Sequence, residues 1–344
     1  MELLLTKNPI IGRMHFKSVG DYFKHFVENA SVFNVATGFI SNDSIAALKQ
    51  ILEFREGALS LNLFIGMNYL DGFTKLQYNA IKDLDGFLVD NRLGHIYLSP
   101  SALYHGKMYS FEKSSKCIGS FVGSSNLGSF VGTGNSYIES DVLFLDSEAK
   151  KINQSIYSLI ELLGKPLIDL PEVTKFVAPD VKVLRDFSYV EELSPQRLDQ
   201  IKSSVTGNRV SIPLKVEAKS NLNTYFGKGK IKGKYSPRGW YEVELIVSKT
   251  LPNIDLLPDK EYGPFHVVTS DGFAFDCERQ GDYSKNLRSS KDLKILGRWI
   301  KGQMENEGAL KIGEPVTSET LDRFGKTHIL FEETSENIWI ISLE

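Results

Sequence analysis

The sequence changes its character near residue 170, and this change constrains the fold more than any other feature. Before it, apolar runs of strand length alternate with helix-patterned segments, an order typical of helices packed against a sheet. After it, short β-rich runs alternate with turn residues, as in a small barrel or sandwich. A chain of 344 residues is long enough to form two cores. We therefore predict an α/β domain followed by a mostly-β domain.

Three prolines, Pro166, Pro171 and Pro179, mark the boundary between the two halves. We place the first domain at 1–170, a linker at 171–190 and the second domain at 191–344. The elements expected in the first domain are strands at 33–39, 59–67, 94–98 and 141–145 and helices at 44–54, 72–89 and 149–163. Those expected in the second domain are strands at 210–216, 240–247, 265–268, 273–276 and 338–342 and one helix from about Ser290 to Gly308.

Basic residues are concentrated in two windows of the second half, although the net charge of the whole chain is only −3. Residues 209–238 contain eight Lys or Arg and one acidic residue, and residues 279–301 contain seven and two. Such segregation is typical of a surface that binds nucleic acid. A solvated lysine-rich face is the alternative explanation of the same pattern.

Composition and cysteine count exclude several classes of protein. Hydrophobic residues make up 42% of the chain, which excludes a disordered polymer, and no apolar run approaches the roughly 18–20 residues of a membrane helix. The apolar segment at the N-terminus is too short for a secretory signal. Cys117 and Cys277 form neither a disulfide framework nor a metal-binding pair. We therefore expect a cytoplasmic protein without membrane contact.

Two short motifs follow one another between Tyr104 and Asp141. The first is His105-Gly106-Lys107, and the second is Gly-Ser-Ser-Asn at 123–126, with Glu139 just before a predicted strand. Each motif alone would occur by chance in a chain of this length, but their ordered occurrence within about twenty residues would not. The alternative is a histidine at a strand edge followed by an ordinary Gly-Ser loop.

The spacing of these residues suits chemistry on a phosphodiester. Residues two apart on a strand share a face, so His105 and Lys107 are expected on the same side. A histidine nitrogen can attack phosphorus while the lysine ammonium neutralises the phosphate oxygens. The turn, through its N–H groups, Ser124 and Asn126, can donate hydrogen bonds to that phosphate, and Glu139 can hold an imidazole in one tautomer. We therefore predict these five side chains as catalytic.

The two motifs resemble the HKD active site of the phospholipase D superfamily. In that family four residues follow the lysine and an aspartate comes next. Here Met108 to Phe111 are the four residues, and Glu112 stands at the position of the aspartate. The wider segments are TGF at 37–39, YHGKMYSF at 104–111, VGSSNLG at 122–128 and YIESDVLF at 137–144. Together they resemble the phospholipase D-like type II restriction endonucleases of the BfiI and NgoFVII kind. The resemblance covers both halves of the chain, although its motifs are specific only in the first.

This resemblance implies that the second domain is a pseudobarrel like the B-three DNA-binding domain of plant transcription factors, with two arms that grip the major groove. The two basic windows match such arms in position. The expected contacts to double-stranded DNA are Lys228, Lys230, Lys232 and Lys234 on phosphates, and Arg238, Trp240, Arg279, Gln280, Asp282, Lys285 and Asn286 on base edges.

The chain contains one HKD-like motif, whereas two-step chemistry needs a nucleophile and a second group that protonates the leaving oxygen. We therefore predict a homodimer, formed through the first domain, in which one His105 forms a phosphohistidine and the other acts as acid and base. Because Lys107 and Asn126 supply the charge and hydrogen bonds, no metal and no other cofactor is expected. The resemblance further implies a short GC-rich site and, as candidate partners, a cognate methyltransferase and a separately encoded ATPase.

Other functions stay open at this point. A phospholipase or phosphatidyl transferase would use the same motif, but it would need an interfacial surface rather than a basic domain. A superfamily member that only binds DNA would not need an intact His105, Lys107 and Asn126. A metal-dependent nuclease built on Glu217-Ala218-Lys219 lacks an acidic partner, and residues 227–235 lack the spacing of a nucleotide-binding loop.

Overall fold

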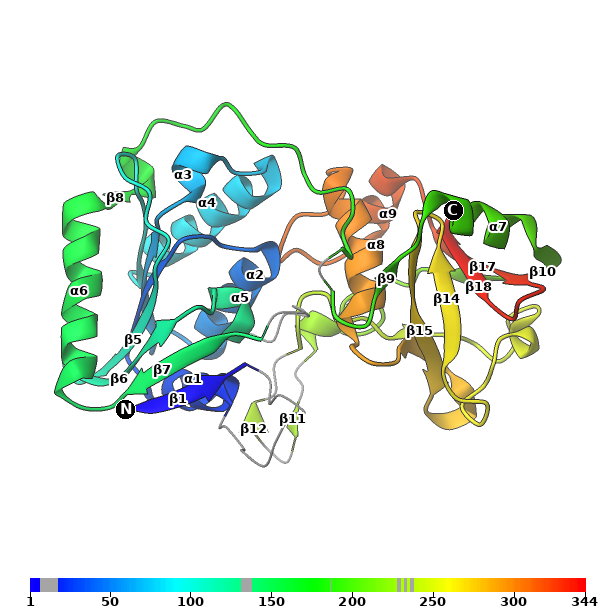
Figure 1. Cartoon of the computed structure of the whole chain (residues 1–344), viewed down its shortest axis with the longest axis horizontal. Coiled ribbons are helices and arrows are strands. Elements are labelled where there is room, and N and C mark those ends of the chain that lie inside the picture. The colour runs from blue at the N-terminus through cyan, green and yellow to red at the C-terminus, as the bar shows by residue number, and fades with distance from the viewer. Residues whose placement is uncertain (7–17, 131–137, 186, 228–229, 232–233, 236–237) are drawn as a thin grey trace. The chain divides into compact units, whose positions relative to one another are not determined.

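The computed structural model describes residues 1–6, 18–130, 138–185, 187–227, 230–231, 234–235 and 238–344. The described residues form two units, one that ends at Pro179 and one that runs from Asp180 to Glu344. Figure 1 shows the elements of each unit. Within the described part of the chain, no helix has the length and apolar character needed to cross a bilayer.

The first unit is built on a mixed sheet. Its strands are β1 (Glu2–Leu5), β2 (Val32–Thr37), β3 (Ser60–Ile65), β4 (Gly94–Leu98), β5 (Lys107–Lys113), β6 (Lys116–Gly123), β7 (Ser140–Phe144) and β8 (Lys165–Pro166). They lie in the order β1-β7-β6-β5-β2-β3-β4-β8. Strands β2, β3 and β4 are parallel, and β5 is antiparallel to β2. Because Thr37 at the end of β2 pairs with Lys107 at the start of β5, the parallel strands end where β5 begins.

Helices cover both faces of this sheet (Figure 1). On one face α6 (Ser147–Leu163) buries Ile156 against Ala36 and Phe64. The other face carries α1 (Val19–Asn29), α2 (Asn42–Phe54), α3 (Asn68–Asp71), α4 (Lys75–Asp90) and α5 (Leu127–Phe130). Between α1 and the sheet lies an aromatic core in which the rings of Phe33 and Phe111 stack at 4.5 Å.

The second unit is a curled, mostly-β structure. Its strands are β9 (Glu191–Glu192), β10 (Val205–Pro213), β13 (Leu245–Ile246), β14 (Phe265–Thr269), β15 (Phe273–Gln280), β16 (Asn286–Ser289), β17 (His328–Thr334) and β18 (Trp339–Leu343). The order is β10-β17-β18-β14-β15-β16-β13, with β9 on β15. The β14–β18 pair is parallel, and the other pairs are antiparallel. A separate two-stranded ladder joins β11 (Lys230–Ile231) to β12 (Lys234–Tyr235).

Three α-helices complete the described part of the second unit. They are α7 (Pro195–Ser203), α8 (Lys294–Asn306) and α9 (Ser318–Phe324). The α8 helix buries Leu296, Trp299 and Ile300, all fully inaccessible, so it forms the centre of the unit's core. The α7 helix buries Ile201 against Val268 and Ile340.

The structure confirms several predicted elements and corrects others. The strand predicted at 94–98 is β4, and the helix predicted at 149–163 is α6. The helix predicted from residue 72 begins at Lys75, because Thr74 accepts a hydrogen bond from the N–H of Gln77 and so caps it. The strand predicted at 240–247 is wrong over most of its length, since only Leu245 and Ile246 form a strand, which pairs with β16, and Glu244 adds a single bridge to Asn221.

Candidate functional site

The His105 segment lies at the end of the sheet where β2, β3 and β4 finish. The loop that leaves β4 carries His105, and β5 begins with Lys107. Two glycines make room for this loop. A Cβ atom at Gly66, just after β3, would collide with Tyr104, and one at Gly38, just after β2, would lie 3.1 Å from Cδ2 of His105. The close approach of the loop therefore depends on the small residues that follow two parallel strands.

Lys107 lies beside the imidazole of His105. Its Nζ is 3.2 Å from Nε2 and 3.4 Å from Nδ1, and it donates a hydrogen bond of 2.8 Å to the carbonyl oxygen of His105. Lys107 is only 7% exposed, and burial lowers the pKa of its ammonium group, an effect that the carboxylate of Glu139 opposes. His105 is exposed, and its ring meets that of Phe39 edge-on at 5.7 Å. The site thus combines an accessible imidazole with a buried cation.

The Gly-Ser-Ser-Asn turn follows β6, which pairs with β5. Its two serines contact different carboxylates: Oγ of Ser124 donates to Glu139, and Oγ of Ser125 donates to Asp141. Ser125 and Asp141 are fully buried, and burial raises the pKa of the Asp141 carboxyl, which the hydrogen bonds from Ser125 oppose. The hydroxyl of Tyr109 donates to the carbonyl oxygen of Ser125 at 2.8 Å. The turn is therefore held in place from β5 and from β7.

Asn126 carries an unsatisfied group. Its Oδ1 atom is buried and has no hydrogen-bond partner among the described residues. A buried polar atom without a partner is rare in folded proteins, because it loses its hydration and gains nothing. The side chain of Asn126 is thus a carboxamide held at the end of β6 with bonding capacity left over.

Glu139 precedes β7, where its N–H donates to Oγ1 of Thr6 at 2.9 Å. Its carboxylate accepts the hydrogen bond from Ser124, and among the described residues no hydrogen bond joins it to His105. The structure therefore pairs Glu139 with Ser124. The role predicted for Glu139, which was to hold an imidazole in one tautomer, is not seen with the imidazole of the same chain. Nor do the described residues contain a cluster of three His, Cys, Asp or Glu side chains placed to hold a metal ion.

Glu112, the residue in place of the family aspartate, is not part of this constellation. Its Oε1 accepts hydrogen bonds from Asn34 at 2.8 Å, Asn153 at 3.1 Å and Tyr157 at 2.8 Å. Asn153 and Tyr157 lie on α6, so Glu112 joins the sheet to that helix. Burial, followed by the hydrogen bond to Glu112, raises the pKa of Tyr157 to about 12. The role of Glu112 in this structure is to hold α6 against the sheet.

On β15 and β16, residues alternate between the core and an outer row. Cys277 and Leu287 point inward and are fully buried. The outer row contains Glu278, Gln280, Asn286 and Arg288, since Gln280 pairs with Asn286 and Glu278 with Arg288. Nε of Arg288 donates to Glu278 at 3.0 Å, and Asn286 donates to Glu244 at 3.2 Å. This row displays the amide, carboxylate and guanidinium groups that read base edges.

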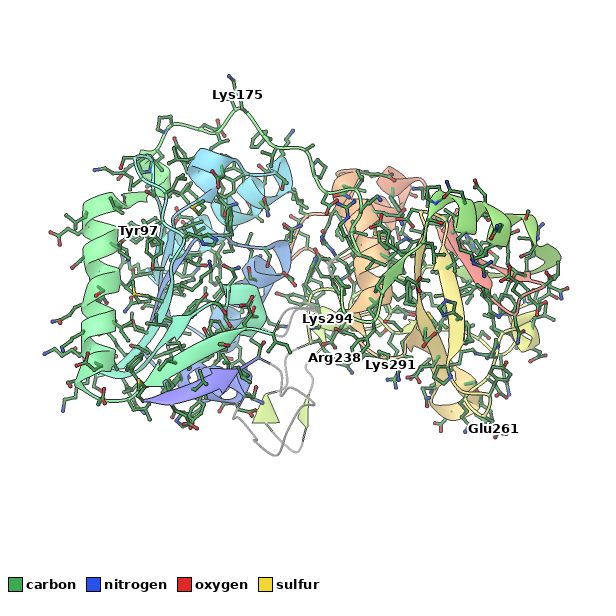
Figure 2. The ribbon with its side chains drawn as sticks, viewed as in Figure 1. Tyr97, Lys175, Arg238, Glu261, Lys291 and Lys294 are labelled. Atoms are coloured by element: carbon green, nitrogen blue, oxygen red, sulfur yellow. The ribbon has the colours of Figure 1, made fainter. Side chains whose placement is uncertain are left out.

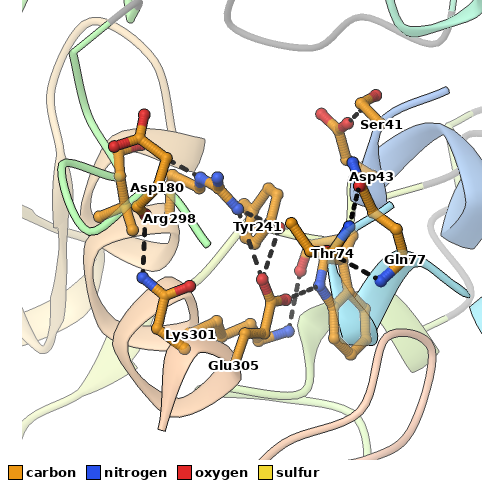
Figure 3. A network of polar contacts seen from close by, with 12 residues as sticks. Ser41, Asp43, Thr74, Gln77, Asp180, Tyr241, Arg298, Lys301 and Glu305 are labelled. Carbon is orange, nitrogen blue, oxygen red and sulfur yellow. Dashed lines mark hydrogen bonds and ion pairs between the residues drawn. The ribbon is translucent and has the colours of Figure 1, made fainter. Parts of the chain in front are cut away.

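Trp240, predicted to read a base, lies instead in the interior and is 2% exposed. Its Nε1 donates to Glu305 at 2.7 Å, and Nζ of Lys301 donates to its carbonyl oxygen at 2.8 Å. Figure 3 shows Glu305 among Tyr241, Arg298 and Lys301. Trp240 is therefore an anchor for the segment that precedes it and not a surface contact.

Arg279 is also interior, at 5% exposed. Its Nε donates to the carbonyl oxygen of Ser284 at 2.9 Å, and its Nη1 donates to those of Ile254 at 3.2 Å and Leu257 at 3.0 Å. The prediction that its guanidinium reads a base is therefore wrong, because all of these donors serve the backbone of neighbouring loops.

The other predicted DNA contacts lie at the surface or outside the described residues. Asp282 and Lys285 are exposed on the turn after β15, and Arg238 pairs with Glu242 at 3.3 Å. Lys230 and Lys234 stand on β11 and β12, where only the backbone is described, while Lys228 and Lys232 lie outside the described residues.

Three basic residues at this surface were not among the predicted DNA contacts. They are Arg288 in the outer row, and Lys291 and Lys294 after β16. Figure 2 labels Lys291, Lys294 and Arg238 on the second unit. The side chain of Lys294 lies beside Gly239, the residue that follows Arg238, since a Cβ atom at Gly239 would be 3.4 Å from the Cε atom of Lys294. The alternation along β16 was the signal that could have identified Arg288, because it shares a face with Asn286.

Comparison with known proteins places both units in one family. Residues 17–162 match the NgoFVII restriction endonuclease N-terminal PLD domain, and residues 200–335 match the NgoFVII C-terminal B3-like DNA-binding domain. No curated protein matches the chain.

Two solved structures are distantly similar to parts of the chain. TrmBL2, an archaeal chromatin protein with a novel mode of DNA binding, is 12% identical with a TM-score of 0.30, over 47% of this chain and 53% of that one. Polyphosphate kinase from Porphyromonas gingivalis is 13% identical with a TM-score of 0.29, over 51% of this chain and 26% of that one. Neither likeness is close enough to inform the fold.

Proposed function

Because the chain belongs to the NgoFVII family of restriction endonucleases, we propose that it hydrolyses phosphodiester bonds at a specific sequence of double-stranded DNA through a phosphohistidine on His105, without a metal ion. The observation that carries this proposal is the position of the Lys107 ammonium, 3.2 Å from Nε2 of an exposed His105, beside a turn that offers Ser124 and Asn126. A cation next to a histidine nucleophile suits a reaction whose transition state gathers negative charge on phosphate oxygens.

In the first step a ring nitrogen of His105 attacks phosphorus. A nitrogen–phosphorus bond forms, and the bond from phosphorus to one deoxyribose oxygen breaks. That oxygen leaves with a proton from a second, protonated imidazole. Lys107 and the amide of Asn126 hold the phosphate oxygens throughout.

In the second step the second imidazole, now neutral, takes a proton from water. The hydroxide oxygen attacks phosphorus, the nitrogen–phosphorus bond breaks, and His105 is regenerated with a phosphomonoester on one DNA end. Since each chain has one such histidine, the second imidazole is that of a second copy, and the active form is a homodimer joined through the first domain.

The second unit would supply sequence recognition. The outer row of Gln280, Asn286 and Arg288 has the side chains that bond to base edges, while Lys285, Lys291 and Lys294 suit phosphates. We assign the nuclease to residues 1–170, the linker to 171–190 and the DNA-binding domain to 191–344.

Three further proposals follow from this activity. The enzyme would act in the cytoplasm, where the DNA lies. A cognate methyltransferase would protect the host's own copies of the site. A separately encoded ATPase is a third candidate partner, and adding it to the cleavage reaction would show whether it is needed.

The test is cleavage of a defined plasmid in EDTA, with the ends mapped by sequencing. Wild type should cut at fixed positions and His105→Ala should not, while His95→Ala, a change on β4 of the same unit, should leave cutting intact. Acid-free denaturing gels should show a protein–DNA adduct that depends on His105. Cutting by His105→Ala, or cutting that stops in EDTA, would refute the mechanism, and specific binding without cutting would favour a DNA-binding protein.

The dimer can be tested with mixed subunits. When wild type is refolded with an excess of His105→Ala chains, most wild-type chains pair with a mutant and lack the second imidazole. Activity per wild-type chain should therefore fall toward zero as the excess rises. Activity that stays proportional to the wild-type chains would show that each chain works alone.

A further inference from the structure

The turn that joins β15 to β16 carries an exposed aromatic residue in a strained backbone conformation. Tyr283 has φ 57° and ψ 28°, and the next residue, Ser284, has φ 52°. Non-glycine residues seldom occupy this left-handed region, and such outliers gather at ligand-binding sites. The Tyr283 side chain is 77% exposed, and its hydroxyl has no hydrogen-bond partner in the described part of the chain. Packing within the chain therefore does not explain why a tyrosine occupies this position.

Buried Arg279 fixes the turn in this shape. It bonds to the carbonyl oxygen of Ser284 on one side and to those of Ile254 and Leu257 on the other. The N–H of Lys260 donates to Oγ of Ser284 at 3.1 Å, which adds a second tie to the same residue. Arg279 and the loop between β13 and β14 thus hold Ser284, and Tyr283 before it is exposed to solvent.

The ring of Tyr283 is partly flanked but not covered. Nζ of Lys249, an exposed residue after β13, lies 4.9 Å from the ring centroid. The ring also borders an open cavity of ≈ 1020 Å³, with Tyr262 elsewhere in its lining. A cation beside an open aromatic face is a suitable arrangement for contact with a base or sugar and its phosphate.

We infer that Tyr283 is a DNA-contacting residue at the tip of the β15–β16 hairpin, that Lys249 bonds to a neighbouring phosphate, and that Arg279 is the positioning residue that presents Tyr283. The inference rests on the proposed function. DNA is the partner because the same hairpin carries Gln280 and Asn286 in its outer row, with Lys285 between them and the tip. A ring that extends beyond base-reading side chains can stack on a base or pack on a sugar.

The test uses a duplex that contains a cleavage site mapped with wild type, and a scrambled duplex of the same composition. Tyr283→Ala should weaken binding to the site about ten- to a hundredfold, the range for loss of one aromatic contact. Tyr262→Ala, which removes an equally large exposed ring from the same cavity, should change it by less than about threefold. Lys249→Gln should reduce the slope of log affinity against log salt by about one.

The positioning role of Arg279 is tested by combining its substitution with Tyr283→Ala. Arg279→Met should weaken binding in the wild-type background but have little further effect in the Tyr283→Ala background, whereas its effect on thermal stability should be the same in both. A structural role alone would give additive losses of affinity.

The outcomes separate this inference from the proposed function. Wild-type protein that binds neither duplex refutes both. Wild-type binding with an unaffected Tyr283→Ala, or with an equal loss in Tyr262→Ala, refutes the inference alone and leaves the nuclease proposal standing.

Discussion

Lys107 and Glu112 lie on the same strand but serve opposite faces of the sheet. Lys107 contacts His105, whereas Glu112 bonds to Asn153 and Tyr157 on α6. Five residue steps along the strand separate their Cα atoms by about 16 Å. The acid that follows the lysine in the sequence motif is therefore remote from His105 and Lys107, and it contacts α6 instead.

Glu112→Ala should accordingly lower stability and spare catalysis. The change leaves the buried amide of Asn153 without an acceptor and removes one of the acceptors of Asn34, so we expect the free energy of unfolding to fall by about 1–3 kcal/mol. Urea denaturation followed by circular dichroism measures this loss. Plasmid cleavage well below the melting temperature should stay within about twofold of wild type, and a hundredfold loss there would contradict the structural role.

Ser124 and Glu139 should behave as one unit in kinetics. Because the hydroxyl of Ser124 donates to the carboxylate of Glu139, either Ser124→Ala or Glu139→Gln disrupts the same pair. We expect each change to slow cleavage by roughly ten- to a hundredfold and the double change to cost little more than the larger single one. Single-turnover rates of the three variants provide the comparison, and multiplied losses would show that the two side chains act separately.

Lys107 should lose its proton below its ordinary pKa of 10.5, because burial disfavours the charged form. The carboxylate of Glu139 acts in the opposite direction, so Glu139→Gln should move the pKa of Lys107 down further. NMR of 13C-methylated lysines against pH reports both values, with Lys107→Arg to assign the signal. An unchanged titration in Glu139→Gln would mean that the carboxylate does not reach the ammonium.

The sequence was sufficient for the α/β class of the first unit and for several of its elements. Period-two and helical patterns located β4 and α6. His105 and Lys107 are close to each other, as predicted, but His105 lies on the loop before β5 and not on the strand itself. It could not locate the partner of Glu139, because that choice depends on how the strand after residue 139 pairs with β6. The same limit applies to the strand predicted at 240–247, where a run of aromatic and branched residues is held in turns by tertiary contacts to α8.

Residue type alone also misjudged two side chains in the second unit. Arginine and tryptophan are common in DNA contacts, but Arg279 is on the inward phase of β15 and Trp240 packs over Lys301, 4.0 Å from its ring centroid. The elements packed against a strand decide which of its alternate residues face the core. The outward phase instead offers Arg288, which shares that face with Asn286.

Tyr283→Gly should separate stability from function. Glycine adopts positive φ without strain, so the variant should gain about 1 kcal/mol of unfolding free energy from the turn. The same change removes the aromatic ring and should weaken DNA binding as Tyr283→Ala does. Thermal denaturation and binding to the mapped duplex, measured on one preparation, test the two effects, and a less stable glycine variant would show that the left-handed turn is not strained.

Lys301 should make the stability of the chain depend on pH above neutrality. The amine is fully buried beside Trp240, and burial lowers its pKa to about 7, against 10.5 for the free side chain. Between these values the unfolded chain binds the proton and the folded chain does not, so the free energy of unfolding contributed by this group rises with pH, by up to about 1.4 kcal/mol per pH unit. Lys301→Met keeps the buried volume without the proton and should remove this rise. Denaturant titrations from pH 7 to 10 measure the free energy of unfolding of both proteins. The same dependence on pH in both would mean that Lys301 stays charged beside Glu305 in the folded state.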